Sequence, residues 1–207
     1  MNHIASAVAA TAMMIGAGAG AVTNVGPQKT QPVMEVMNPM VGGQAMLASR
    51  DLMDNLSRSP DHTAFVAALR QTGLTDRLTG KEEFTLFAPT NAAFAALGDK
   101  AMLDKAVMAK ILGYHLVRGK YDSQTLLRVI NEGEGKAKLK TVGGGSLLAM
   151  MNGPTNIVLM DEKGQTANIS IYDVYEKNGV MQVIDRVVQP ASVTPLSARG
   201  LQAVPRS

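Results

Sequence analysis

The segment that most constrains the fold of this chain is residues 84–97, where strand, corner and helix signals follow one another without a gap. Residues 84–88 (Phe-Thr-Leu-Phe-Ala) are almost wholly apolar on both faces of a two-residue period, which is typical of a strand buried on both sides. Pro89 has no N–H to donate to a neighbouring strand, so we expect the strand to end there. The chain must therefore supply packing layers for both faces of a sheet.

A short helix is predicted directly after this strand. The side chain of Thr90 or Asn91 can accept a hydrogen bond from the free N–H groups of a first helical turn, so either residue can be its N-cap. Phe94 and Leu97 lie three residues apart, and both therefore point from the helix into one core.

Helical patterns dominate the first half of the chain and alternating patterns the second half, which predicts an α+β fold. The expected helices are residues 49–56, a helix opened by Ser59-Pro60-Asp61 and closed by Gly73, a turn at 74–78, a helix from near Asp99 to a stop at Gly113, and a helix capped by Ser123. The expected later strands, mainly antiparallel, are 114–117, 136–142, 146–151, 157–160, 166–171 and 180–188.

The composition excludes several classes of protein. With 207 residues the chain has room for one domain with a substantial core, or at most two small ones. It contains no Cys, so it can form neither a disulfide nor a thiolate metal site. The net charge is only +3 without a long basic run, and aromatic residues make up 4% with no Trp, so we expect no nucleic-acid partner.

The N-terminal segment resembles an export signal. Residues 4–22 are uncharged and apolar, and they contain small-x-small patterns suited to cleavage, although no Lys or Arg precedes them. A loosely structured arm is the alternative, and we expect no stable membrane span because Ala and Gly supply too little transfer free energy. The expected organisation is a signal peptide at 1–22, a linker at 23–45, one domain at 46–190 and a flexible tail at 191–207.

Three short motifs, in order, resemble the signatures of the fasciclin domain family. Residues 84–94 are similar to its first signature, Tyr114-His115 to its central Tyr-His motif, and residues 178–185 to its second signature. Residues 40–46 resemble a lead-in common in bacterial members, so the resemblance covers about residues 40–190. It implies a compact domain with an antiparallel β sandwich or wedge core, flanked by several helices. The expected structural residues of the two signatures are Phe84, Phe87, Pro89, Thr90, Asn91, Phe94, Asn178, Gly179 and Asp185.

The family resemblance also suggests binding residues. Adhesion in the family is ascribed to the motif that Tyr114-His115 resembles. The alternative, which we favour, is a half-buried imidazole bonded to a backbone group, with Tyr114 in the core. Asp173-Val174 resembles an Asp-Ile element linked to integrins in animal members, but we favour an Asp that closes a turn or cap at the end of a strand.

The second signature has Gln182 where the family usually has His. We therefore expect no functional histidine at this position. Asp185 is expected to be a buried hydrogen-bond acceptor rather than a general base.

Lys136, Lys138 and Lys140 alternate with apolar residues and therefore share one face of their strand. This face could meet an acidic polysaccharide or an anionic lipid surface. The alternative, which we favour, is that the lysines protect an edge strand from pairing with another chain.

No catalytic arrangement is evident in the sequence. Of the three histidines, His3 lies in the segment expected to be removed, and His62 is expected to be exposed on a first helical turn. His115 has no second ligand for a metal and no visible nucleophile beside it. We therefore expect no enzyme activity, no metal and no cofactor.

The expected function is a secreted, periplasmic or cell-surface adhesion module that binds cell-surface or matrix proteins or polysaccharides, as the family resemblance implies. The first alternative is a periplasmic protein that binds a small ligand, glycan or lipid in a groove near Tyr114. A hydrolase that uses His115 with Asp185 ranks last.

Overall fold

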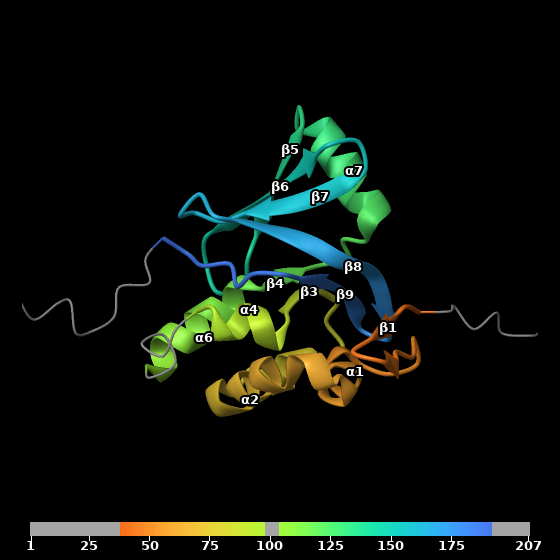
Figure 1. The fold of residues 1–207 in the computed structure, drawn as a ribbon, viewed down its shortest axis with the longest axis vertical. Helices are drawn as coiled ribbons and strands as arrows, with labels where there is room; N and C mark the ends of the chain where they lie inside the picture. The colour runs from red at the N-terminus through yellow and green to blue at the C-terminus, as the bar shows by residue number, and fades with distance from the viewer. Residues whose placement is uncertain (1–37, 98–103, 192–207) are drawn as a thin grey trace, which may run out of the picture. The chain divides into compact units, whose positions relative to one another are not determined.

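The computed structural model describes residues 38–97 and 104–191 (Figure 1). The predicted signal peptide, the linker up to residue 37, the expected helix start near Asp99 and the tail from residue 192 lie outside the described residues.

A seven-stranded sheet in the order β4-β3-β9-β8-β7-β6-β5 forms the centre of the domain. Its strands are β3 (Phe84–Pro89), β4 (Leu116–Arg118), β5 (Lys136–Lys140), β6 (Ser146–Asn152), β7 (Asn156–Met160), β8 (Thr166–Glu176) and β9 (Gly179–Ile184). All neighbours are antiparallel except β3 and β9, which run parallel with Phe84 opposite Gly179. Among residues 38–97 and 104–191, the two edges of the sheet meet at a bridge between Val117 of β4 and Thr141 directly after β5, so the sheet is nearly closed.

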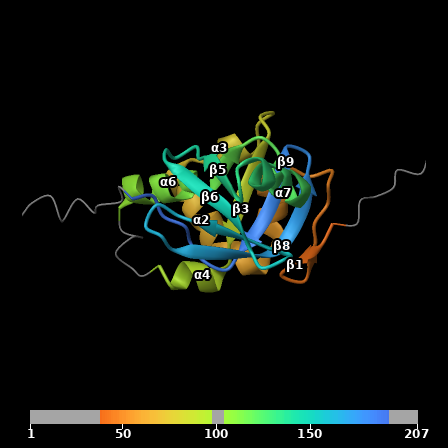
Figure 2. The same cartoon turned by 90° about the horizontal axis from the view of Figure 1, so that it is seen from above.

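The helices lie in two groups. They are α1 (Leu52–Arg58), the 3₁₀ turn η1 (Pro60–His62), α2 (Thr63–Thr72), α3 (Thr75–Leu78), α4 (Asn91–Ala95), α6 (Lys105–Tyr114) and α7 (Ser123–Glu132). Helices α1, α2, α4 and α6 lie on the side of β3, β4 and β9, whereas α7 lies beside β5 and β6 at the opposite end (Figures 1 and 2). The α+β class predicted from the sequence is confirmed.

Strand β3 is buried on both faces, as its sequence predicts, because it separates two cores. Phe84, Leu86 and Ala88 pack with the apolar faces of α1, α2, α4 and α6. Phe87 points to the other side, into a second core formed by α7 and the inner face of the remaining strands. The strand ends at Pro89 as expected.

Of the two predicted cap candidates, Thr90 is the N-cap of α4, and its hydroxyl accepts a hydrogen bond from the N–H of Ala93 at 3.3 Å. Asn91 uses its side chain differently. Its amide donates to the carbonyl of Pro60 at 2.8 Å and its oxygen accepts from the N–H of Ala64 at 3.0 Å. These two hydrogen bonds of Asn91 connect the turn between β3 and α4 to the start of α2.

The prediction that Gly113 ends its helix, and that a strand begins at Tyr114, is wrong. Helix α6 continues to Tyr114, His115 is its C-cap, and β4 begins at Leu116. Gly113 is small because the loop after β5 passes against it: a Cβ there would lie 2.7 Å from the Cα of Gly143. The glycine thus serves a close approach of two backbones and not a helix stop.

Other boundaries differ from the predictions for local reasons. Asp122, not Ser123, caps α7, and its carboxylate accepts from the N–H of Thr125 at 2.8 Å. Ser59 makes no capping bond, because its hydroxyl bonds Nδ1 of His62 at 2.9 Å. Residues 40–45, which were predicted to belong to a linker, form a hairpin of β1 (Met40–Val41) and β2 (Gln44–Ala45), with Gly42 and Gly43 at positive φ in its turn.

Candidate functional site

His115 lies inside the domain with no exposed surface, and is thus more deeply buried than expected. The N–H of Val188 donates to its Nε2 at 3.2 Å, so Nδ1 carries the proton and donates to the carbonyl of Ile111 at 2.8 Å. Burial lowers the pKa of this imidazole to about 4. The ring is therefore neutral near pH 7, and it joins α6 to the segment after β9.

Tyr114 is also fully buried, in the second core. Its hydroxyl donates to the carbonyl of Ser146 at 2.6 Å, and burial raises its pKa. Neither Tyr114 nor His115 offers side-chain surface to a partner in this state of the domain.

Asp173 occupies a bulged part of β8 and has a positive φ of 57°. Its carboxylate accepts hydrogen bonds from the N–H and the hydroxyl of Ser123, the former at 2.7 Å, and from the amide of Gln182 at 3.0 Å. Val174 beside it is fully buried. The structure therefore brings Asp173 and Gln182 together, and Asp173 fastens the first turn of α7 to the sheet.

The expectation that Asp185 is buried is wrong, because β9 already ends at Ile184 and the next residue faces solvent. The carboxylate of Asp185 accepts from the N–H of Asn168 at 2.8 Å and from its side-chain amide at 2.7 Å. Both ring nitrogens of His115 have backbone partners, so the pair needed for a hydrolase is not formed.

The expectation that His62 is exposed is also wrong. Its side chain is fully buried, and burial lowers its pKa. The helix opens with the turn η1 rather than at Ser59, and this turn directs His62 inward toward the Ser59 hydroxyl.

Asn178 and Gly179, from the second signature, hold β9 in place. The Asn178 amide donates to the carbonyl of Leu78 at 2.7 Å, and its oxygen accepts from the N–H of Leu52 at 2.9 Å. A Cβ at Gly179 would collide with the carbonyl oxygen of Phe84, so no larger residue fits this register.

The three lysines of β5 are exposed and alternate with buried residues, as predicted. Two of them, Lys138 and Lys140, line a cleft of about 430 Å³ between the edges β4 and β5. Arg118 and Tyr121 line it from the other side, and the remaining lining residues are Val117, Thr141 and Val142. We call this the basic cleft, because its lining contains three cationic side chains and no carboxylate.

Two further cavities have mixed charge. One, of about 400 Å³ beside α4, contains both Asp185 and Arg186. Another, of about 440 Å³, combines Asp76 and Glu82 with Arg77 and Arg118.

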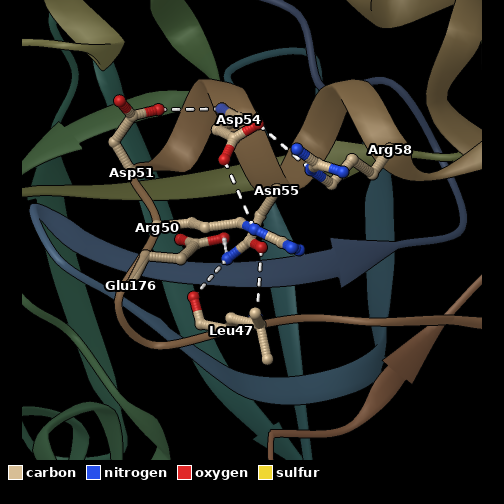
Figure 3. A network of polar contacts seen from close by, with 7 residues as sticks. All are labelled: Leu47, Arg50, Asp51, Asp54, Asn55, Arg58 and Glu176. Carbon is tan, nitrogen blue, oxygen red and sulfur yellow. Dashed lines mark hydrogen bonds and ion pairs between the residues drawn. The ribbon is translucent and has the colours of Figure 1, made fainter.

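A buried carboxyl group, which the sequence analysis missed, lies where β8 meets α1 (Figure 3). Glu176 is 4% exposed, its Oε1 accepts a bond of 3.4 Å from the Asn55 amide, and its Oε2 has no partner among the described residues. Arg50 and Arg58 both pair with Asp54 instead. Burial raises the pKa of Glu176 to about 8. The sequence feature that could have revealed the burial of Glu176 is its place two residues after the apolar Val174, on the same strand face.

Within residues 38–97 and 104–191 no cluster of three or more His, Asp or Glu side chains could hold a metal ion. In that part of the chain no helix has the length and apolarity needed to cross a bilayer.

Comparison with known proteins agrees with this fold. A sequence model of the fasciclin domain matches residues 60–190. The chain is 32% identical over 136 residues to protein sll1483 of Synechocystis, covering 62% of this chain and 67% of that protein. It is 27% identical over 199 residues to the immunogenic protein MPB70 of Mycobacterium bovis, covering 91% of this chain and 94% of that protein. Over 149 residues it is 26% identical to human periostin, covering 68% of this chain.

A solved structure with the same fold is a FAS1 domain pair from the insect cell adhesion molecule fasciclin I. It matches with a TM-score of 0.60 at 17% identity, over 71% of this chain. The chain spans 53% of that structure and 16% of periostin. This chain thus belongs to the fasciclin domain family.

Proposed function

We propose that this protein is a non-enzymatic binding module that acts in cell attachment outside the cytoplasm, through contacts with proteins or polysaccharides of a cell surface or matrix. The observation that carries this proposal is the fasciclin fold, which the chain shares with the domain pair of an insect cell adhesion molecule. A signal peptide at residues 1–22 is part of the proposal.

The state of the titratable core residues supports a binding role over catalysis. His62 and His115 are both buried, and His115 is bonded through both ring nitrogens to backbone groups. A general base needs hydrogen-bond reach to a substrate, and these rings have none in the folded domain.

We assign Tyr114, His115, Asp173 and Val174 to the scaffold rather than to the contact surface. Three of them are fully buried, and the carboxylate of Asp173 is engaged by Ser123 and Gln182. A substitution at any of them would then reduce attachment by destabilising the domain.

The test is an attachment assay on abiotic and host surfaces with a strain that lacks the gene. We expect reduced attachment, restored by the wild-type gene, and the protein in the exported fraction. His115→Ala is expected to reduce attachment and thermal stability together. Normal attachment of the deletion strain would refute the adhesion role and favour a small-ligand or glycan-binding protein.

A further inference from the structure

The basic cleft is a product of how the sheet closes. Strands β4 and β5 are the two edges of the seven-stranded order, and their only ladder contact in the described residues is the bridge between Val117 and Thr141. The main-chain bond from Val142 to Leu116, at 2.8 Å, continues this contact. These backbone contacts between the edges β4 and β5 therefore fix the distance between the two walls of the cleft.

The cationic side chains of the cleft make few charge contacts within the described part of the chain. Neither Lys138 nor Lys140 takes part in any of its ion pairs. Arg118 has only a pair with Glu82 at 3.9 Å, in which both side chains are more than 60% exposed, and such pairs are weak. Glu162 interacts electrostatically with Lys138 but forms no ion pair with it, and its two oxygens accept hydrogen bonds from the N–H groups of Ser146 and Ala191.

The cleft also has one aromatic residue in its lining. Tyr121 is half-buried and lines the cleft together with the partly buried Val142 and the buried Val117. An aromatic ring can pack against the apolar face of a sugar ring while the neighbouring cations meet its carboxylates. Lys138 and Lys140 are two residues apart on one strand face, about 7 Å along the strand, which suits an extended chain with repeated charges.

We propose that the basic cleft binds an acidic, carboxylated polysaccharide, with Arg118, Lys138 and Lys140 as ionic contacts and Tyr121 as the stacking surface. This inference rests on the proposed binding function and names its ligand class.

Two other polyanions fit these observations less well. Membrane attachment needs apolar side chains that can enter a bilayer, and the exposed large apolar residues in the described segments, Met40 and Leu127, do not line the cleft. Single-stranded nucleic acid is normally held by several aromatic platforms, and this cleft has one.

The test uses the full chain and polygalacturonate as the acidic polysaccharide, with neutral dextran as the comparison, measured by titration calorimetry at two salt concentrations. We expect saturable binding of polygalacturonate that weakens with salt, and none of dextran. The double variant K138Q/K140Q is expected to lose about tenfold in affinity. The matched control is K136Q/K105Q, which removes one lysine from the same strand face and one from α6, both outside the cleft, and it should lose less than about twofold.

Binding measurements with Tyr121→Ala test whether the cleft recognises the sugar ring or the negative charge alone. We expect it to weaken binding of polygalacturonate but not of inorganic polyphosphate, which has no ring to stack. Equal losses for K138Q/K140Q and K136Q/K105Q would refute the cleft as the site. Binding of phosphatidylglycerol vesicles or oligonucleotides, but not of polygalacturonate, would refute the ligand class.

The attachment assay distinguishes a failure of this inference from a failure of the proposed adhesion function. Normal attachment by cells carrying K138Q/K140Q, where the deletion strain attaches poorly, would preserve adhesion and refute a role of the cleft in it. Loss of polygalacturonate binding and attachment together in K138Q/K140Q, with an unchanged melting curve, would support both.

Discussion

Glu176 should make the domain less stable as the pH rises, and Glu176→Gln should remove this effect. The carboxyl group is buried with one oxygen unpaired, so the folded state disfavours its ionised form, and its pKa rises from 4.5 to about 8. Because the folded pKa is raised, the group is protonated in both states below pH 4.5. Between pH 4.5 and 8 the unfolded chain loses this proton and the folded domain keeps it, so unfolding becomes more favourable.

The size of the effect follows from the pKa difference. Each pKa unit corresponds to about 1.4 kcal/mol, so the cost is about 1 kcal/mol at pH 5, about 3 at pH 7 and about 4 at pH 8. Glutamine has the shape of the protonated acid and no charge to desolvate. The variant should therefore exceed the wild type in free energy of unfolding by about these amounts.

The assay is urea-induced unfolding of wild type and Glu176→Gln at pH 5, 6, 7 and 8. Glu132→Gln is the control, since it removes a carboxylate from the exposed end of α7 and should keep the wild-type pH dependence. A stability difference between Glu176→Gln and the wild type that is the same at pH 5 and pH 8 would refute the reasoning. It would mean that Glu176 is not selectively held in its neutral form.

Three further substitutions test the scaffold. His115→Ala should lower the free energy of unfolding by about 3–5 kcal/mol, because it leaves a cavity and an unpaired N–H at Val188. Since the pKa of His115 is lowered in the folded domain, the stability advantage of the wild type over this variant should fall as the pH drops from 6.5 to 4. Urea unfolding at several pH values measures both, and a variant as stable as the wild type would contradict the buried position. Asp173→Ala should cost about 2–4 kcal/mol through the lost α7 contacts and the positive φ, again by urea unfolding, whereas a change below about 0.5 kcal/mol would contradict the anchoring role. Gly179→Ala should prevent soluble folding, judged by expression and circular dichroism, while Gly80→Ala, which meets only ordinary contacts, should fold.

Several features set by neighbouring residues were predictable from the sequence. Burial of Phe84 and Phe87 follows from a two-residue period, the cap at Thr90 from its hydroxyl, and the exposed lysines from alternation. The position of His62 was not predictable in this way, since its burial depends on a turn that directs the ring toward Ser59.

Features set by distant partners could not be predicted. The basic cleft needs β4 and β5 to meet across the closed sheet, and no local pattern places Arg118 or Tyr121 opposite Lys138. The role of Gly113 likewise depends on Gly143, which belongs to a different element.

The position of β9 has a consequence for synthesis of the chain. In the strand order of the sheet, β9 lies between the pair β4–β3 and the strands β8 to β5, and it is the last of the described strands along the chain. Until Gly179–Ile184 is available, β3 lacks its parallel neighbour and has one edge unpaired. Pairing across 95 positions, from Phe84 to Gly179, is slow because a long loop must close first. A chain stopped before Gly179 would therefore present an aggregation-prone edge, and the nascent domain completes its fold only at its end.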